Sequence, residues 1–305
     1  MKTTIVGYKN HALRLHSILQ DMNVESGLWN HHTDDFSKVT DSDAVLISSP
    51  SHTHIEYIHR ILDQSSAYIF CEKPPVTNSD DLDSLRLLPY NQQQRVFFNF
   101  NYRFSHLANL VKSKDLGSPV RFSFASSHGL ALKDSFKDNW RFFSADELMG
   151  VYGTVGIHFV DLCLWLLGDY SEININKHNY SGSKTSDSVS INMKFKNGCM
   201  VDIFVSYVTP FINHSQLIFD NAILDLDNGE LNLYEGRNTL DSNGNFAKPK
   251  RRNCVSYKDS KDYYNHSLHN SLRHFIDTAT MKAGFSLEDF AVSIKSNEIL
   301  LNGDK

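Results

Sequence analysis

Short apolar runs alternate with helical patterns through the first third of the chain. The runs Thr3–Val6, Asp43–Pro50 and Tyr68–Cys71 contain almost no polar alternation, which is typical of strands buried on both faces of a parallel sheet. Further strands are predicted at residues 28–31 and 95–100, and helices at 12–19, 55–62 and 105–114. This alternation predicts a doubly wound α/β domain.

The pattern changes after the break Gly117-Ser118-Pro119, where we place a domain boundary. Ser188–Lys196 alternates polar and apolar residues and runs into Asn197-Gly198, a strong hairpin signal, and Cys199–Tyr207 resumes the alternation. Further strands are predicted at 120–126, 216–226 and 230–234, and closing helices at 266–279 and 287–301. This half is predicted to hold a large, mostly antiparallel sheet with one face open.

Composition narrows the class of protein without changing this fold. The 305 residues are 41% hydrophobic and 21% charged, with a formal net charge of -5, so we expect neither nucleic acid nor an anionic membrane as a partner. The one basic run, Lys248–Arg252, is expected to be a solvated loop. No signal peptide opens the chain and no apolar run suits a membrane crossing, so we expect a cytoplasmic protein.

Four scattered cysteines show no close-pair spacing, which favours neither a metal site nor a disulfide framework. They are expected to be mostly buried. The pair His31-His32 is expected to belong to a polar loop, because no further ligand lies nearby in the sequence.

The first candidate for chemistry is Lys73, which follows the Tyr68–Cys71 run within Glu72-Lys73-Pro74-Pro75. Two prolines end the strand there, so the backbone must turn. Ligands in α/β sheets bind outside the carboxyl ends of the strands. Taken alone, the segment is also compatible with a solvated surface turn.

The first strand, Thr3–Val6, is followed by Gly7, Lys9 and Ala12, which occupy the three glycine positions of the dinucleotide-binding pattern G-x-G-x-x-G. Lys9 replaces the glycine that permits close approach of a pyrophosphate, and its ammonium can supply charge instead. No acidic residue closes the second strand, where Asn30 and His31 stand, so the choice between NAD and NADP stays open.

A second candidate site begins in the glycine-rich segment Gly150–Asp161. Thr154 is predicted to be the N-cap of a helix that carries His158, Asp161 and Trp165 on one face. An imidazole at a positive helix end favours its neutral form, which suits a general base. A structural histidine is the alternative.

Six segments, in this order, resemble the Gfo/Idh/MocA family of nicotinamide-dependent oxidoreductases: Gly7-Tyr8 with His16, Ser49-Pro50 with His54, Glu72-Lys73-Pro74, Asn101-Tyr102-Arg103-Phe104, Trp140-Arg141, and Gly156-Ile157-His158 with Asp161. The resemblance implies an α/β protein. Its Rossmann domain, with a doubly wound parallel sheet, would occupy residues 1–117. Its α+β domain for substrate and oligomer contacts would occupy residues 118–305.

The resemblance also implies roles for particular residues. Lys73 and His158 are expected to be catalytic, the first polarising a substrate oxygen and the second exchanging the hydroxyl proton. The cofactor, NAD or NADP, is expected to contact Gly7, Lys9, Asn10, Ser49, Pro50, His54, Glu72 and Lys73. A carbohydrate-like substrate (a sugar, an inositol or a nucleotide-sugar) is expected to contact Arg103, Trp140, Arg141, Tyr152, Thr154 and His158. No metal is expected. The chain is expected to form a homo-oligomer through its C-terminal sheet.

Two alternatives to a dehydrogenase stay open. Lys9 and Thr154 stand where the family usually has glycine and aspartate, which is compatible with a non-catalytic ligand-binding or regulatory member. A dehydratase or hydrolase that uses bound NAD transiently would begin with the same hydride transfer.

Overall fold

The computed structural model describes residues 1–138, 140–143, 148, 150–236, 240–247 and 249–302 of the 305. The described chain forms two compact units. The first consists of Met1–Asn101 and Leu268–Asn302, and the second of Tyr102–Ser267.

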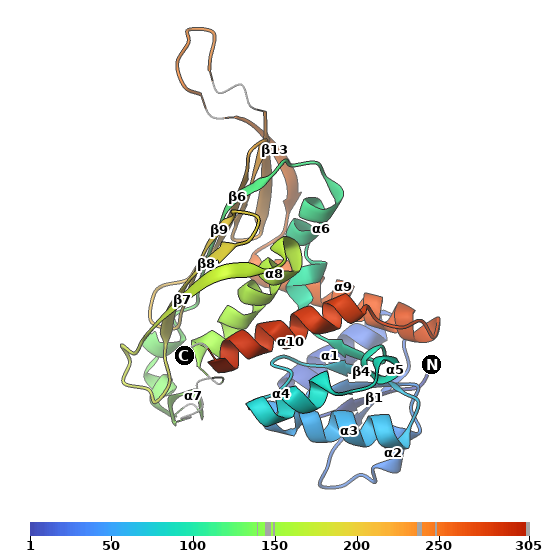
Figure 1. The fold of residues 1–305 in the computed structure, drawn as a ribbon. Coiled ribbons are helices and arrows are strands. Elements are labelled where there is room, and N and C mark those ends of the chain that lie inside the picture. The colour runs from blue at the N-terminus through green and yellow to red at the C-terminus, as the bar shows by residue number, and fades with distance from the viewer. Residues whose placement is uncertain (139, 144–147, 149, 237–239, 248, 303–305) are drawn as a thin grey trace. The chain divides into compact units, whose positions relative to one another are not determined.

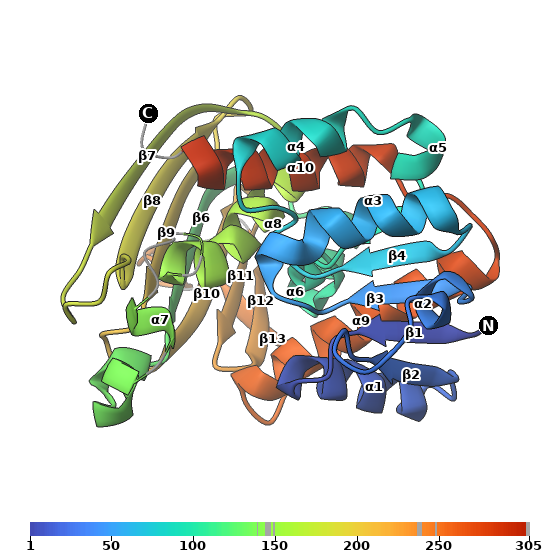
Figure 2. The same cartoon turned by 90° about the horizontal axis from the view of Figure 1, so that it is seen from below.

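The first unit is built on a five-stranded sheet with the order β2-β1-β3-β4-β5, and all of its strand pairs are parallel. Figure 2 shows β2, β1, β3 and β4 side by side in this order. The carboxyl ends of the strands therefore lie along one edge. The strands are β1 (Thr3–Val6), β2 (Ser26–Trp29), β3 (Ala44–Ile47), β4 (Tyr68–Cys71) and β5 (Val96–Phe98). The predicted doubly wound parallel sheet is confirmed.

Helices cover both faces of this sheet, as the connections of parallel strands require. Figure 1 shows α1 above and α3 below the strands. Phe275 of α9 packs on Phe70 and Phe97, while Phe290 of α10 packs on Phe98. The helices are α1 (Asn10–Asp21), α2 (Ser37–Thr40), α3 (His54–Gln64), α4 (Ser79–Arg86), α5 (Tyr90–Gln93), α9 (Ser260–Thr280, from Leu268 onward in this unit) and α10 (Leu287–Asn302), with a 3₁₀ turn at Ser51–Thr53.

The units divide the chain at positions other than the predicted boundary near Gly117. The first unit ends at Asn101, because helix α6 (His106–Ser113) packs against α8 (Ile157–Leu167) of the second unit. The chain returns to the first unit at Leu268, where the aromatic side chains of α9 and α10 complete its core. A break in composition marks the end of α6, whereas these long-range contacts leave no local sequence signal.

The second unit is built on an eight-stranded sheet with the order β13-β12-β11-β10-β6-β9-β8-β7, in which only β6 and β9 are parallel. One face is apolar and buried, and includes Phe122, Ile203 and Leu217. The opposite face is polar, with the ion pair Arg121–Asp202. The strands are β6 (Pro119–Ser127), β7 (Tyr170–His178), β8 (Ser188–Phe195), β9 (Met200–Ser206), β10 (Ile212–Phe219), β11 (Ala222–Asp227), β12 (Glu230–Glu235) and β13 (Lys250–Ser256). The predicted, mostly antiparallel sheet is confirmed.

Helices α6 and α8 lie on one side of this sheet (Figure 1). A π-helical turn, Tyr152–Gly156, leads directly into α8. The remaining helical segments of the unit are α7 (Trp140–Phe143) and the 3₁₀ turns Asn101–Phe104, Leu130–Leu132 and Asp134–Asp138, the first of which begins at the last residue of the first unit.

Three expectations for this sheet need correction. The single strand predicted at 216–226 is two strands, β10 and β11, joined at Asp220-Asn221. Strand β7 was not predicted. Lys248 lies outside the described residues, but Lys250–Arg252 is part of the edge strand β13 rather than a loop, and Arg251 pairs with Glu230 of β12. Cross-strand charge pairing of this kind stabilises an edge that basic composition alone does not reveal.

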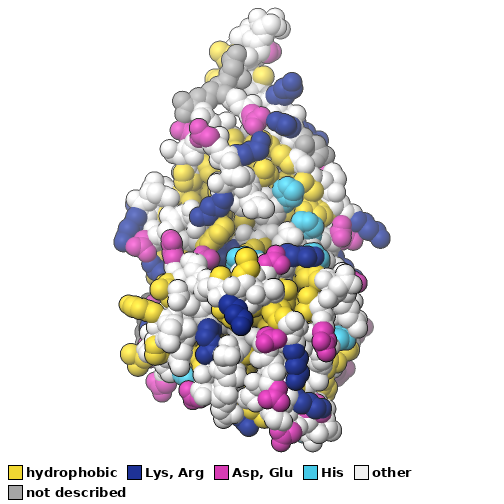
Figure 3. Space-filling view, turned by 90° about the vertical axis from the view of Figure 1, so that its right-hand side faces the viewer, with side chains coloured by type: hydrophobic (Ala, Val, Ile, Leu, Met, Phe, Trp, Pro, Cys, Tyr) yellow, Lys and Arg dark blue, Asp and Glu magenta, His cyan; other side chains and the backbone are white. Residues whose placement is uncertain are grey.

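On the face of the molecule shown in Figure 3, basic and acidic side chains are intermingled over both units. Of the cysteines, Cys71, Cys163 and Cys199 are buried and Cys254 is partly exposed. Among the described residues, no helix has the length and apolar character to cross a membrane.

Candidate functional site

The turn after β1 passes close to the ends of both neighbouring strands. The Gly7 amide donates to the Trp29 carbonyl over 3.1 Å. A Cβ atom at Gly7 would lie 2.9 Å from the Ser48 carbonyl oxygen, and its φ of +136° is disfavoured for other residues. Glycine is therefore required here, as the first position of a dinucleotide-binding turn requires it.

Lys9 is the N-cap residue of α1, with an extended backbone and an exposed side chain that makes no capping bond. Asn10 is the first residue of the helix and is also exposed. No acidic residue occupies the first turn of α1, so the positive end of the helix and the Lys9 ammonium add their fields. This arrangement suits an anionic ligand group.

Glu72 follows β4 and is held by side chains from two other elements. Its Oε1 atom accepts hydrogen bonds of 2.8 Å from His11 of α1 and from the Asn99 amide, which follows β5. Asn99 in turn accepts from Ser271 of α9 over 2.7 Å. Neither His11 nor Asn99 stands out in the sequence as a site residue, because only the tertiary fold brings them to Glu72.

Burial of Glu72 disfavours its charged form. The charge and hydrogen bond of His11, the hydrogen bond of Asn99 and the nearby Lys73 ammonium outweigh this cost and lower the pKa of Glu72 to about 2. The carboxylate is therefore ionised at every ordinary pH. It places a fixed negative charge beside Lys73 at the carboxyl edge of the sheet.

The loop that carries Lys73 is anchored on both sides. His54 contacts the Pro74 carbonyl with Nδ1 and the Ser49 carbonyl with Nε2, both over 3.0 Å. Beyond the loop, the Val76 amide donates to Asn297 of α10 over 3.2 Å. Burial lowers the pKa of His54. Because its side chain is 1% exposed and contacts a carbonyl in each of two loops, His54 holds these loops together rather than presenting a surface to the cofactor, as was predicted.

Two buried polar groups in the first unit suit a bound ligand. Ser48 at the end of β3 has a buried hydroxyl, and Asn101 beyond β5 has a buried amide; neither hydroxyl nor amide has a hydrogen-bond partner among the described residues. Buried polar atoms of this kind are found where a ligand or an ordered water completes a site. Ser49 accepts from Thr53 over 2.7 Å, and Pro50 is exposed at the start of the next turn. Together with Gly7 and Lys9, these residues fit a nicotinamide dinucleotide.

In the second unit, the helix begins before Thr154, which corrects the predicted N-cap. Thr154 lies in the π-helical turn, and its hydroxyl donates to the Gly150 carbonyl over 2.7 Å. It also contacts the Tyr207 hydroxyl. Because a threonine has one hydroxyl proton, which goes to Gly150, Tyr207 is the donor in this second bond. Thr154 is thus an acceptor, rather than a donor, toward other groups.

Tyr207 is a member of this candidate site that the sequence did not indicate. It is 3% exposed, and its ring lies 4.8 Å from that of His128. Its position just beyond β9 continues the alternation that predicts core residues, so no sequence signal distinguishes it. The chain therefore places a phenol against the threonine that stands where the family usually has aspartate.

His158 lies in the first turn of α8 and is 7% exposed. Its ring centroid lies 5.1 Å from that of Tyr102, a phenol whose pKa burial raises to about 12. Because the π-helical turn precedes it, His158 is not at a free helix end, and the predicted influence of a positive helix terminus on this imidazole does not apply.

Arg103 forms a bidentate ion pair with Asp161 of α8. Its Nε and Nη2 atoms donate to the two carboxylate oxygens over 2.8 and 2.6 Å, and both side chains are at most 5% exposed. This pair fastens the 3₁₀ turn Asn101–Phe104 to the helix that carries His158. A substrate contact by Arg103 stays a prediction.

The other predicted substrate contacts differ in how far the structure describes them. Tyr152 is fully buried, with its ring 3.2 Å from the Cβ position of Gly156, so it is a packing residue that exposes no surface to a substrate. The side chains of Trp140 and Arg141 lie outside the described residues. Among the described residues, no group of three His, Cys, Asp or Glu side chains could hold a metal ion.

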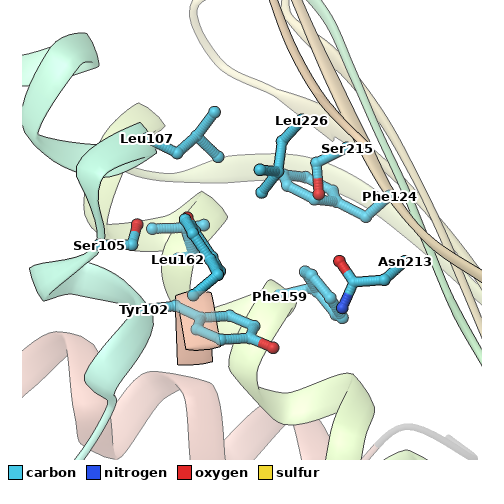
Figure 4. A pocket seen from close by; sticks show the side chains of 10 residues that line it. Tyr102, Ser105, Leu107, Phe124, Phe159, Leu162, Asn213, Ser215 and Leu226 are labelled. Carbon is cyan, nitrogen blue, oxygen red and sulfur yellow. The ribbon is translucent and has the colours of Figure 1, made fainter. Parts of the chain in front are cut away.

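Within the second unit, a small hollow lies between the sheet and α6 and α8 (Figure 4). Its volume is about 10 Å³, which is room for one water molecule. Its walls are largely apolar and include Phe124, Phe159 and Leu162. This hollow is too small to hold a sugar.

Two family models match the chain in succession. Residues 5–100 match an oxidoreductase family with an NAD-binding Rossmann fold, and residues 104–222 match the C-terminal domain of the same Gfo/Idh/MocA family. The predicted nicotinamide dinucleotide is thereby confirmed as the class of cofactor.

Curated relatives are similar over part of their length. Levoglucosan dehydrogenase of Pseudarthrobacter phenanthrenivorans is 26% identical over 155 residues, covering 48% of this chain and 39% of that protein. D-glucoside 3-dehydrogenase of Escherichia coli is 22% identical over 148 residues, covering 48% and 42%. The matches thus span about two fifths of these relatives.

Among solved structures, UDP-N-acetylglucosamine 3-dehydrogenase of Acidithiobacillus ferrooxidans has the same fold, with a TM-score of 0.75 over 99% of this chain and 95% of that one, at 15% identity. The fold of both units and the two successive family matches agree with each other and with the six sequence segments. The chain therefore belongs to the Gfo/Idh/MocA family of oxidoreductases.

Proposed function

We propose that this protein is a nicotinamide-dependent dehydrogenase or reductase that interconverts a secondary alcohol and a ketone on a carbohydrate-like substrate. The observation that carries the proposal is the position of Lys73. It leaves the carboxyl end of β4 in an anchored loop, next to a glutamate that stays ionised. The fixed carboxylate favours a charged Lys73 ammonium, which is the form that stabilises a developing alkoxide.

The bound nicotinamide supplies or accepts the hydride. Lys73 polarises the substrate oxygen, and His158 takes the hydroxyl proton during oxidation and returns it during reduction. Arg103 and Asp161 hold the helix of His158, so the imidazole keeps its orientation. Thr154, as an acceptor, receives a hydrogen bond from a substrate hydroxyl.

Gly7, Lys9, Asn10, Ser49 and Pro50 would hold the dinucleotide. Gly7 lets the first turn pass close to the ends of β2 and β3, while Lys9 and the first turn of α1 offset the charge of the pyrophosphate. In other members, glycine at this position lets the pyrophosphate approach the backbone closely. Here the charge of Lys9 would take the place of that close approach.

The substrate class rests on the relatives, which are named for levoglucosan, D-glucosides and UDP-N-acetylglucosamine. Polyhydroxyl substrates suit a site with hydroxyl and imidazole groups, as provided by Thr154, Tyr207 and His158. A nucleotide-sugar, an inositol and a free sugar are all compatible with these groups.

Titration of the purified protein with NADH and NADPH, followed by nicotinamide fluorescence, tests the proposal. We expect saturable binding of at least one of them.

We also expect Lys73→Met and His158→Ala to lower turnover by roughly two orders of magnitude with dinucleotide binding retained. Absence of binding at millimolar concentration would favour the non-catalytic alternative, and unchanged turnover would remove the catalytic roles. Product analysis separates simple oxidation from transient oxidation within a dehydratase or hydrolase.

We also propose a homo-oligomer formed through the outer face of the second sheet. On that face Phe204, Ile218 and Ile223 are partly exposed among polar side chains such as His214 and Asp225, which are hydrogen-bonded over 3.0 Å. Covering these apolar side chains favours a symmetric contact. Sedimentation should show an oligomer for the natural chain and a smaller species for Ile218→Glu; a monomeric natural chain would refute the proposal. A cytoplasmic location stays a prediction.

A further inference from the structure

The loop after β2 lies where a dinucleotide-binding unit recognises the ribose of the adenosine. Strand β2 ends at Trp29, whose carbonyl accepts the Gly7 amide of the first turn. In such units a carboxylate after the second strand accepts the 2′-hydroxyl of NAD, whereas a basic group at this place accommodates the 2′-phosphate of NADP. The side chains that follow Trp29 therefore decide which dinucleotide is preferred.

The carboxylates of this loop are engaged in folding it. Asp34 accepts the Asn30 amide over 2.9 Å with Oδ2 and the Lys38 ammonium over 2.6 Å with Oδ1, and its side chain is 20% exposed. Asp35 accepts the Ser37 amide over 2.7 Å with Oδ1. The residue directly after β2 is Asn30, whose side-chain oxygen accepts the His32 amide. No carboxylate stands directly after the strand.

Directly beyond Asn30, the loop exposes two imidazoles. His31 and His32 are both exposed, and their ring centroids are 3.7 Å apart. The Tyr8 ring, which belongs to the turn after β1, lies 6.3 Å from that of His31. Tyr8 is followed by the exposed Lys9. The first turn and the β2 loop thus bring two imidazoles and an ammonium to one edge of the sheet.

His31 also lines an open hollow of the first unit. The hollow has an aromatic wall formed by Trp29, Phe36 and Tyr57, which lie edge-on or stacked against each other. Arg60 covers Phe36, with its guanidinium carbon 3.6 Å from the ring centroid. The hollow is also lined by the carboxylates Asp34, Asp35 and Glu56, and Trp29 and Phe36 are at most 8% exposed. The flat group that it offers to a purine base is therefore the partly exposed guanidinium of Arg60.

We propose that His31 and His32 bind the 2′-phosphate of the dinucleotide, so that the protein prefers NADP(H) to NAD(H). This inference rests on the proposed function. Imidazole N–H groups donate to phosphate oxygens, and hydrogen bonds to an ionised acceptor are the stronger ones. The 2′-hydroxyl of NAD would meet no carboxylate directly after β2 to accept its proton.

Fluorescence titrations with NADPH and NADH test the preference on the natural chain and on the double variant His31→Gln, His32→Gln. We expect the natural chain to bind NADPH at least about tenfold more tightly than NADH. The double variant should lose that difference while its affinity for NADH stays the same. His178→Gln, an exposed histidine on β7, is the matched control and should change neither affinity.

A second readout does not involve the nicotinamide. Adding 2′,5′-ADP should shift the imidazole proton resonances of His31 and His32, whereas ADP without the 2′-phosphate should leave them in place. Asp35→Asn is the competing variant, because Asp35 is an exposed carboxylate of this loop and an alternative acceptor for a 2′-hydroxyl. We expect it to leave the NADH affinity unchanged.

The outcomes separate this inference from the proposed function. Binding of NADH as tight as or tighter than that of NADPH, or a loss of NADH affinity in Asp35→Asn, would overturn the preference and leave the dehydrogenase proposal standing. An equal loss of both affinities in the double variant would also overturn it. Failure of both dinucleotides to bind would overturn the proposed function and this inference together.

Discussion

At the scale of single residues, the candidate site depends on hydrogen bonds that fix charge and proton position. The pKa of Glu72 is lowered because His11, Asn99 and Lys73 stabilise its carboxylate. The Thr154 hydroxyl donates its one hydrogen bond to a backbone carbonyl, which sets the direction of its bond with Tyr207. Both effects belong to the folded state alone, so both are measurable as differences in stability.

The lowered pKa of Glu72 predicts a dependence of stability on pH. Its ordinary value is 4.5 and its folded value about 2, so the carboxylate contributes stability above pH 4.5 that is lost as the pH falls toward 2. We expect Glu72→Gln to cost on the order of 3 kcal/mol at neutral pH and almost nothing near pH 2. Urea unfolding from pH 2 to 7 measures this difference. A difference that is constant across the range would contradict the assigned charge network.

The hydroxyl pair of Thr154 and Tyr207 predicts coupled effects on stability. Removing either hydroxyl, by Thr154→Val or Tyr207→Phe, removes the hydrogen bond between the two side chains and should cost about 1 kcal/mol. The double variant removes both polar groups and should cost less than the sum, with a coupling of about 1 kcal/mol. Urea unfolding of the four proteins completes the cycle. Strictly additive losses would show that the two hydroxyls do not bind each other.

At the scale of elements, helix α8 and the π-helical turn before it position His158. The turn contains Gly153, where a Cβ atom would lie 2.1 Å from the Leu148 carbonyl oxygen, so only glycine lets the segment fold back this closely. The helix is then fixed from the side by the Arg103–Asp161 pair. Placement of the imidazole therefore depends on the preceding turn and on a partner 58 residues earlier in the chain.

The buried pair predicts a strong effect from a conservative change. Asp161→Asn leaves the Arg103 guanidinium buried without its counter-charge and should destabilise the second unit by about 3–5 kcal/mol. The exposed pair Arg121–Asp202 of the same unit is the matched control, and Asp202→Asn should cost at most about 1 kcal/mol. Thermal unfolding compares the two variants. Similar losses in both would show that burial does not decide the energy of the pair.

Much of the arrangement of elements was predictable, for a physical reason. Strand β1 coincides with a β-branched run and β4 with an apolar run, and the turn of β8 into β9 coincides with Asn197-Gly198, because local patterns determine these features. The helix start was misplaced at Thr154, because a π-helical turn has no sequence signature. His11, Asn99 and Tyr207 were missed, because their roles arise only from contacts distant in the sequence.

At the scale of the whole molecule, the chain forms most of the first unit, then the whole second unit, and then returns. Helices α9 and α10 supply Phe275 and Phe290 to opposite faces of the parallel sheet. The ends of the chain are therefore integral to the dinucleotide-binding unit. The sequence predicted these helices but not that they belong to the first unit, because their partners lie about 200 residues earlier in the chain. Asn99 and Ser271 are separated by 172 residues, and Val76 and Asn297 by 221.

Because α9 and α10 complete the core of the first unit, the effect of truncating the chain before them can be predicted. A chain that ends at Ser267 exposes Phe70, Phe97 and Phe98 to water, so we expect loss of dinucleotide binding together with aggregation or unfolding of the first unit. A chain that ends at Asn302 retains both helices and is the control, which should bind normally. Gel filtration and dinucleotide titration provide the measurement. Normal binding by the shorter chain would show that the two helices are dispensable.

The interrupted first unit also determines the order of events during synthesis. A ribosome adds about 5–20 residues per second, and domains fold as units once their last element has emerged. The second unit is complete in the nascent chain at Ser267, whereas the first, although begun earlier, waits for residues up to Asn302. The apolar parallel sheet therefore remains unfinished throughout translation of the intervening unit, which makes it the part of the newborn protein with most need of chaperone protection.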